Sequence, residues 1–409
     1  MKQRICIVTP GALGSNPRVV KEADALQAAG YEVTVISTRT MEAVDALDAT
    51  VLAQSAWRTV RLDFRNSAQR LPHRLHQEMS RWLFLACKWP ALAGHALNWM
   101  TGPLMRAALQ QQAALYIGHY SAGLVAAAHA ATHHSAHYAF DAEDFHPGDP
   151  PEEPEHDQQR CLLRAIDTRH LRAATYLSAA SPGIAEAYSA NYGIAAPTVL
   201  LNVFPRSQAP AGATPKGTAL PGPSLYWFSQ TIGPDRGLEC AVHALAQTRC
   251  AVHLYLRGTA LPGFVAQLHE IALKIGVADR LHILPPAAPA EMERLAGAYD
   301  LGLVGETGVT LNRKIALTNK LFSYALAGVP ALISDIPAHR TYALTAGAAV
   351  RLYPVDRPQG LADAIDSLMT GDGTALAAAR AHAFDLGQRS LNWDEEQKIL
   401  LREVAKALT

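Results

Sequence analysis

The sequence predicts an α/β protein with two Rossmann-like, doubly wound domains, and three observations support this fold class. The chain has 409 residues, which is too long for one ordinary core. Short β-branched runs alternate with longer Ala- and Leu-rich segments in both halves, a pattern typical of parallel sheets with crossover helices. A stretch rich in Pro and Gly separates the two halves.

Each expected strand is a short apolar run. In the first half the runs are Arg4–Thr9, Tyr31–Ser37, Thr59–Asp63, Leu115–Gly118, Tyr138–Asp141, Thr175–Ser178 and Thr198–Asn202. In the second half they are Ser224–Ser229, Val252–Arg257, Leu281–Leu284, Leu301–Val304, Pro330–Ser334 and Ala349–Leu352. Each half therefore has enough strands for a sheet of its own.

The domain boundaries follow from this alternation. Residues 1–203 form the expected first domain and residues 224–385 the second. Between them, 204–223 has the prolines, glycines and small residues of an extended linker. The remaining segment, 386–409, carries apolar residues at near-helical spacing. We expect it to form a final helix that could cross back to the first domain.

Composition excludes several classes of protein. Lys plus Arg equals Asp plus Glu at 36 each, so no net positive field exists to bind nucleic acid. The five cysteines are widely spaced and include no CxxC pair, which argues against a disulfide framework or a structural zinc site. The first apolar run is much shorter than that of a secretory signal. We therefore expect a cytoplasmic protein.

The most apolar long stretch, 82–105, is interrupted by Lys88 and two prolines, so a membrane-spanning helix is not expected. The region 81–106 could instead contact the inner face of a membrane and help to bind a lipid-linked acceptor. A buried or dimer-forming pair of helices explains the same residues. These residues are Trp82, Trp89 and Trp99, with Arg81, Lys88 and Arg106 nearby.

A glycine-containing turn follows the first strand. Gly11 and Gly14 precede a helical pattern, and free backbone amides at such a turn can bind a phosphate or a sugar hydroxyl. Binding of NAD is disfavoured, because the spacing is not G-x-G-x-x-G and the second strand ends Ile36-Ser37-Thr38 without an acid. A turn that serves only chain reversal is the alternative.

Two loops of the second half carry cations beside predicted helix starts. Arg236 follows a strand in a Gly-containing loop, where its guanidinium can reach a diphosphate. Lys320 follows Thr318 and Asn319, either of which can cap the next helix. Cations placed there would stabilise a departing nucleoside diphosphate. A solvated arginine at a turn and a solvated lysine on an ordinary capped helix are the alternatives.

The run NKLFSYALAGVPALISD resembles the donor-site segment of GT-B glycosyltransferases of the GT4-like group, N-K-x-F-E-Y-x-x-A-G-x-P. Further segments extend the resemblance over nearly the whole chain. They are SNPRVVKEADALQAAGYEVTVIS, ASPGIAEAYSANYG, VLLNVFP and GPDRGLECAVHAL. The resemblance implies the GT-B fold, a nucleotide-diphosphate sugar donor bound by the second domain, and an acceptor bound by the first.

The same resemblance assigns site residues in the second domain. Arg236 and Lys320 would contact the donor diphosphate, and Glu306 would lie near the transferred sugar. Backbone amides around Asn319, Leu321 and Phe322 would complete the phosphate site. Independently of the resemblance, the glycine turn of the first domain makes Gly14 a further candidate for donor binding. One departure concerns the ribose, since many relatives carry a Glu-x7-Glu pair. This sequence has Ile315 and Ser323 at those positions.

In the first domain, His119, Asp141 and Glu143 are the candidate catalytic residues. Each follows or ends a predicted strand at the carboxyl edge of the sheet. The resemblance implies that His119 contacts the sugar, and an inverting enzyme could use Asp141 or Glu143 as general base on the acceptor hydroxyl. Solvated loop carboxylates, one of them capping a helix, are the alternative.

No metal or other cofactor is expected. His129 and His133 stand four apart on a predicted helix, but no carboxylate or cysteine accompanies them. The sequence thus indicates a glycosyltransferase that moves a sugar from a nucleotide-diphosphate donor to a glycan, lipid-linked or small-molecule acceptor. Two alternatives remain: a nucleotide-sugar epimerase or hydrolase on the same fold, and a non-catalytic homologue, suggested by Ser323.

Overall fold

The computed structural model describes residues 2–212 and 220–409, which fold into two compact units. Unit 1 comprises residues 1–200, 310–312 and 397–409, and unit 2 comprises 201–309 and 313–396. Of the expected linker, 204–223, residues 213–219 lie outside the described part of the chain. Arg206–Gln208, within the linker, forms a short 3-10 helix.

Unit 1 contains a parallel sheet of seven strands in the order β3-β2-β1-β4-β5-β6-β7. The strands are β1 Arg4–Val8, β2 Glu32–Arg39, β3 Arg58–Asp63, β4 Leu115–His119, β5 His137–Ala142, β6 Tyr176–Ala179 and β7 Thr198–Val199. Every strand expected in this half is confirmed, with ends that differ by at most three residues. The short, buried β-branched runs identified them because a parallel sheet is covered on both faces.

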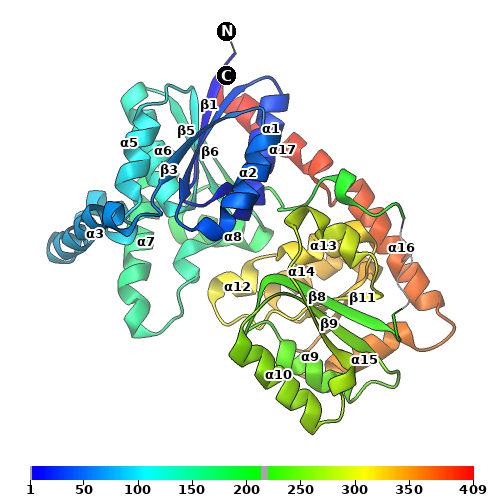
Figure 1. Cartoon of the computed structure of the whole chain (residues 1–409). Coiled ribbons are helices and arrows are strands. Elements are labelled where there is room, and N and C mark those ends of the chain that lie inside the picture. Colours follow the sequence, from blue (N-terminus) through cyan, green and yellow to red (C-terminus); the bar gives the residue numbers. More distant parts are fainter. Residues whose placement is uncertain (1, 213–219) are drawn as a thin grey trace. The chain divides into compact units, whose positions relative to one another are not determined.

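Helices cover both faces of this sheet. Figure 1 shows α1 on one side and α5 and α6 on the other, with α3 at the periphery of the unit. The helices are α1 Pro17–Ala28, α2 Asp45–Gln54, α3 Ser67–Cys87, α4 Ala93–Leu97, α5 Thr101–Leu109, α6 Tyr120–His134, α7 Asp157–His170 and α8 Pro182–Tyr192. The central strand β1 is accordingly buried from Ile5 to Val8.

Unit 2 contains a second parallel sheet, of six strands, in the order β10-β9-β8-β11-β12-β13. The strands are β8 Ser224–Ile232, β9 His253–Ala260, β10 Leu281–Leu284, β11 Leu301–Val304, β12 Ala331–Ser334 and β13 Val350–Tyr353. All six expected strands of this half are confirmed. Both sheets reverse their strand order beside the first strand, the position at which doubly wound folds bind ligands.

The core of unit 2 lies between this sheet and its helices. Trp227 and Leu256 on the strands pack with Leu238 of α9 and with Leu361 and Ile365 of α15. The helices are α9 Leu238–Leu245, α10 Pro262–Lys274, α11 Met292–Ala296, α13 Asn319–Ala327, α14 Pro337–Ala346, α15 Pro358–Met369 and α16 Thr374–Arg389. The short helix α12, Leu311–Ile315, is divided, because its first two residues belong to unit 1. With two doubly wound units, the predicted fold class is confirmed.

The last helix, α17, runs from Trp393 to Ala407, and its first residues, up to Glu396, belong to unit 2. Its residues from Gln397 onward belong to unit 1. There the side chain of Gln3 reaches the carbonyl of Leu408, with 3.4 Å between Nε2 and O, and Figure 1 shows the two ends of the chain close together. Among the helices of the described residues, none has the length and apolarity needed to cross a bilayer.

Candidate active site

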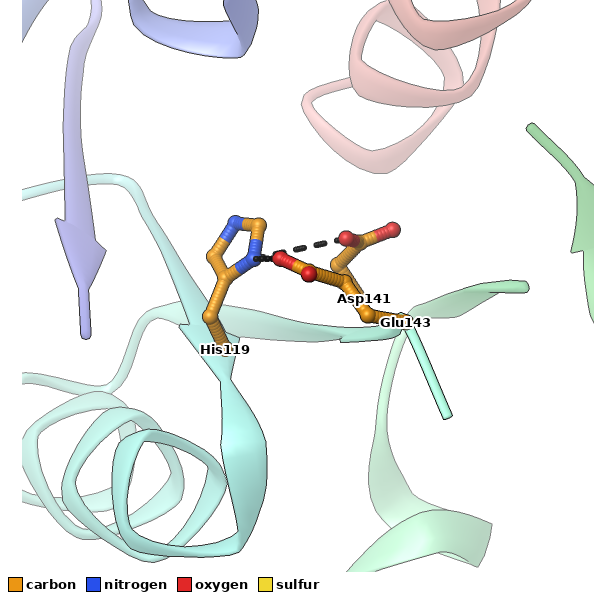
Figure 2. Close-up of side chains that lie close together, drawn as sticks. All are labelled: His119, Asp141 and Glu143. Carbon is orange, nitrogen blue, oxygen red and sulfur yellow. Dashed lines mark ion pairs between the residues drawn. The ribbon is translucent and has the colours of Figure 1, made fainter. Parts of the chain in front are cut away.

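In unit 1 the structure brings His119, Asp141 and Glu143 together at the carboxyl edge of the sheet. His119 is the last residue of β4 and is the register partner of Asp141 on β5, and Glu143 directly follows β5. One ligand atom from each residue lies within 4.8 Å of the others. Figure 2 shows both carboxylates directed at the imidazole.

A pair of glycines positions His119. A Cβ on Gly118 would lie 2.6 Å from the backbone of Gly123, and a Cβ on Gly123 would lie 2.4 Å from the carbonyl oxygen of Val8. Because neither has a side chain, α6 can begin at Tyr120 and still pack closely on β1 and β4. The tight turn leaves His119 beneath the helix start, where its side chain is fully buried.

Acidic side chains surround the imidazole of His119. Nε2 lies 2.6 Å from Oε2 of Glu22, which comes from α1. Nδ1 lies 3.3 Å from Oδ2 of Asp141 and 3.5 Å from Oε1 of Glu143. Of the three carboxylates, only Glu143 is appreciably exposed, with 18% of its side-chain surface accessible. His119 therefore faces carboxylates at both ring nitrogens.

Asp141 is held by Arg18, a buried residue of α1. The guanidinium donates from Nε to Oδ2 at 2.5 Å and from Nη2 to Oδ1 at 2.7 Å, which is the bidentate geometry of a strong charge-assisted pair. Nη1 also donates to the carbonyl of Leu200 at 2.9 Å, and the hydroxyl of Ser178 donates to Oδ1 of Asp141. Both oxygens of Asp141 are thus occupied within unit 1.

The charges of this cluster fix its protonation. Burial lowers the pKa of His119, but Glu22, Glu143 and Asp141 together raise it to about 10, so the ring is an imidazolium at neutral pH. Burial raises the pKa of Asp141, but the pairing with Arg18 has the opposite and larger effect, and the resulting pKa is about 2. Asp141 is therefore a stable carboxylate that accepts a proton poorly, and the cluster contains cations and anions in alternation.

The three residues of Figure 2 also have the composition of a metal site, but their engagement fits internal pairing better. The ring of His119 is already paired through Nε2 with Oε2 of Glu22, at 2.6 Å. The oxygens of Asp141 already accept hydrogen bonds from Arg18. His129 and His133, on α6, belong to no group of three potential ligands among the described residues.

In unit 2, three sequence-predicted residues meet at the carboxyl ends of β8 and β11, which are adjacent strands. Arg236 lies between β8 and α9, Glu306 follows β11, and Lys320 is the second residue of α13. Gly237 has a φ of +67°, and a Cβ there would lie 2.5 Å from the carbonyl oxygen of Gly305. The two glycines thus allow the Arg236 loop to touch the Glu306 loop.

Glu306 bridges the two cations. Its Oε1 lies 3.3 Å from Nζ of Lys320, and its Oε2 lies 3.3 Å from Nη1 of Arg236. Glu306 is 2% exposed and Lys320 is 7% exposed, whereas the side chain of Arg236 is 31% exposed. The ammonium of Lys320 also lies 5.6 Å from the ring centre of Trp227, within the range of a cation–π contact.

This arrangement leaves a surplus of positive charge in a buried place. Burial lowers the pKa of Lys320, and the carboxylate of Glu306 opposes this shift. Burial raises the pKa of Glu306, but Lys320, Arg236 and His339 lower it to a net value below its usual range. Two cations share one ionised carboxylate, so the group is suited to bind an anion.

The start of α13 lies beside this charge group. Thr318 is the N-cap, but its hydroxyl makes no capping bond, so it does not occupy the amides of Asn319 and the residues after it. The amide of Leu321 donates to the carbonyl of Thr318 at 3.1 Å. Phe322 is fully buried. The positive end of the helix dipole adds to the charge of Lys320.

Ser323, at the position where many relatives carry a glutamate, is directed into the protein interior. Its hydroxyl donates to Oε1 of Glu293 at 2.6 Å, and both residues are fully buried. Glu293 lies on α11, a neighbour of α13. The serine therefore joins two helices of unit 2.

Gly14 has a packing function in unit 1. Its amide donates to Oδ1 of Asp48 at 2.7 Å, and a Cβ would lie 2.5 Å from that of Leu47. The glycine lies in a 3-10 turn before α1, whose own start is capped by Asn16. Because its amide is engaged, a phosphate would have to displace Asp48 to reach it.

The apolar segment 81–106 divides into an exposed and a packed part. Trp82 and Trp89 are exposed. Trp99 lies edge-on to Phe64, with 4.9 Å between ring centroids, and stacks with His73. Ala93, Ala96 and Leu104 are buried in the core. The spacing of the tryptophans in the sequence does not show which of them pack against the rest of unit 1.

Sequence reasoning missed the partners of the site residues. Arg18 and Glu22 stand four residues apart on α1, and both are buried. Two opposite charges on the apolar face of a predicted helix could have indicated buried polar contacts, because buried charges are paired. Gly237 and Gly305 both lie in loops, and no local feature of the sequence shows that they touch. The acid that accepts from Ser323 comes from a separate helix, so no spacing could have predicted it.

The two doubly wound units define the GT-B class of fold. Anabaena HepE in complex with UDP-glucose is similar in structure, with a TM-score of 0.71 and 17% identity over 98% of this chain and 99% of that one. Sucrose-phosphate synthase from Thermosynechococcus elongatus aligns with a TM-score of 0.71 and 14% identity, over 99% of this chain and 100% of that one. A glycosyltransferase from Rickettsia africae aligns with a TM-score of 0.68 and 12% identity, over 100% and 99%.

These likenesses establish a shared fold. No protein-family model and no curated protein matches this sequence.

Proposed function

We propose that this chain is a glycosyltransferase of the GT4-like, hexose-transferring type that moves a sugar from a nucleotide-diphosphate donor to a hydroxyl group. The observation that carries the proposal is the buried group of Arg236, Glu306 and Lys320 at the start of α13. A diphosphate gains negative charge as the glycosidic bond breaks, and two cations with a helix N-terminus stabilise that charge. The similar HepE structure contains UDP-glucose, which supports a donor of this kind.

In this proposal each member of the group has a separate task. Lys320 and Arg236 bind the diphosphate, helped by amides around Asn319. Glu306, which pairs with both cations, becomes free to accept a hydrogen bond from the transferred sugar when phosphate oxygens take over the cations. Since side chains supply the positive charge, the reaction is proposed to need no metal ion. Ser323 helps to hold α13 in place through Glu293.

Unit 1 is proposed to bind a glycan, lipid-linked or small-molecule acceptor. Among its three candidates we assign the general base to Glu143, because Asp141 is fully engaged by Arg18. His119 is a positioning residue, since its buried imidazolium lies 3.5 Å from Oε1 of Glu143. A base of this kind is needed if the reaction inverts the configuration of the sugar. We place the reaction in the cytoplasm, supported by five cysteines that are all free.

A screen of nucleotides tests donor binding. UDP, GDP, dTDP and CMP are each added to the protein, with and without EDTA, and thermal unfolding is measured. One nucleoside diphosphate is expected to raise the unfolding temperature, because a ligand at 100 times its dissociation constant stabilises the folded state by about 2.7 kcal/mol. EDTA should not change the shift. If no nucleotide stabilises the protein, the non-catalytic alternative replaces this proposal.

The nucleotide that binds then identifies the donors to assay. Nucleotide release that depends on an added acceptor is the expected result. Rapid release without acceptor, or an epimerised sugar in the recovered donor, would instead favour the epimerase or hydrolase alternative.

Replacing Glu143 with glutamine tests its assignment as base. The change is expected to lower kcat by about 100-fold or more, because the amide cannot accept the proton of the acceptor hydroxyl. The nucleotide-induced thermal shift should be unchanged. Glu155→Gln, at an exposed carboxylate of the same unit, is the matched control and should leave kcat unaltered. A Glu143→Gln enzyme with wild-type kcat would remove this residue from the mechanism.

A further inference from the structure

We propose that α3 and the residues just after it bind the surface of an anionic lipid bilayer. Large apolar side chains project from this helix into solvent: Leu71, Leu75, Met79 and Trp82 are 58%, 62%, 57% and 75% exposed. Seven of the fifteen exposed large apolar residues of the described chain lie between positions 71 and 89. The other three of the seven are Leu83, Leu85 and Trp89.

These side chains form one continuous face. Leu71, Leu75, Met79 and Trp82 follow each other at intervals of four, four and three residues, which places them on the same side of an α-helix. The face is wide, because Leu83 and Leu85 border it on either side. The acid Glu78 lies near one edge of the face, between Leu71 and Leu85 around the helix. Single exposed apolar residues are ordinary on protein surfaces, whereas a contiguous helix face is not.

The opposite side of α3 fixes the helix to unit 1. Ser80 and Phe84 are buried, and α3 packs against α4. The side-chain amide of Gln77 donates to the carbonyls of Ala96 and Leu97, at 3.3 and 2.8 Å. The apolar face is therefore presented outward by a helix whose inner side is already occupied, at the periphery of the unit in Figure 1.

Charge selects an anionic bilayer as the partner. From Ser67 to Lys88 the sequence has four Lys and Arg residues and a single acid, whereas the whole chain is balanced at 36 of each sign. The acid, Glu78, is paired with Arg81 at 3.0 Å, and Arg74 and Lys88 are exposed beside the apolar face. A second copy of this chain would bring like charges together, while anionic headgroups would neutralise them.

The residue types suit the interface of a bilayer as well. Trp82 and Trp89 expose indole rings, which combine an apolar body with one polar N–H and favour the headgroup region. Leucines on the same face can enter the boundary of the acyl chains while the helix lies parallel to the surface. Trp99, which is half-buried against Phe64, takes no part. Membrane binding by this face does not depend on the reaction and can be measured without substrate.

Flotation of the full-length protein with vesicles tests the proposal. Vesicles of phosphatidylcholine alone are compared with vesicles in which about one third of the lipid is phosphatidylglycerol. The protein is expected to float with the anionic vesicles, and binding should weaken as salt is added. Leu75→Glu/Trp82→Glu should reduce the bound fraction at least about ten-fold. Arg74→Gln/Lys88→Gln should reduce the affinity about five-fold for each charge removed.

The matched control is Leu273→Glu/Leu344→Glu, which changes two exposed leucines of unit 2 and should leave vesicle binding intact. All four positions of the two Glu variants are exposed, so thermal unfolding should match that of the wild type and exclude misfolding. Wild-type protein that stays with the unbound fraction, or equal binding by Leu75→Glu/Trp82→Glu, would overturn the proposal. So would a dimer in light scattering that this variant converts to a monomer, because the face would then join two copies.

Discussion

Lys320→Met is expected to lower kcat/KM for the nucleotide-sugar donor by about 100- to 1000-fold. The ammonium is the most buried cation of the donor group, and its charge opposes the growing charge of the departing diphosphate. Methionine retains an apolar chain beside Trp227 and removes only the charge. Steady-state release of the nucleoside diphosphate, together with the nucleotide-induced thermal shift, measures the effect.

Two further variants show whether the loss comes from the donor site. Lys274→Met removes an exposed lysine of unit 2 that is also ion-paired, with Glu270, and should retain full activity. In Lys320→Met the carboxylate of Glu306 has lost its lysine partner. The double variant Lys320→Met/Glu306→Gln also replaces this carboxylate with a neutral amide. If the double variant regained activity, the loss would come from that carboxylate and not from the missing cation. Wild-type turnover by Lys320→Met would contradict the proposed function itself.

Arg18→Met is expected to lower the free energy of unfolding by about 3 to 5 kcal/mol. The change leaves Asp141 as a carboxylate in a place where only 2% of its side chain is accessible. Such a charge has lost both its bidentate partner and its hydration, and His119 alone cannot replace the two hydrogen bonds. Urea unfolding at neutral pH, followed by circular dichroism, measures the loss.

An exposed pair in the same unit provides the comparison. Arg58 and Glu32 lie 3.5 Å apart with 77% and 45% of their side chains accessible, and Arg58→Met should cost no more than about 1 kcal/mol. Arg18→Met/Asp141→Leu replaces both buried charges and should recover much of the loss. Equal destabilisation by Arg18→Met and Arg58→Met would show that the buried pair contributes little to stability.

The sequence pointed to two of the three residues that meet in the charged group of unit 2. Arg236 and Lys320 stand beside predicted helix starts, which is a local pattern of the chain. Glu306 was identified by resemblance, and its position between the two cations came only from the structure. Gly14 shows the opposite case, because its sequence suggests a phosphate turn and its contacts assign it to packing against α2.

The sequence by itself determined the fold class and the thirteen strands, because alternating apolar periods and turn residues are local properties of the chain. Only the tertiary structure decided which charges meet, since Arg18 and Asp141 are 123 residues apart and Lys320 pairs with an acid from another loop. It also decided that Trp99 packs against Phe64 and is half-buried while Trp82 is exposed. The neighbours of a side chain depend on how whole elements pack, and residue spacing within one element does not contain that information.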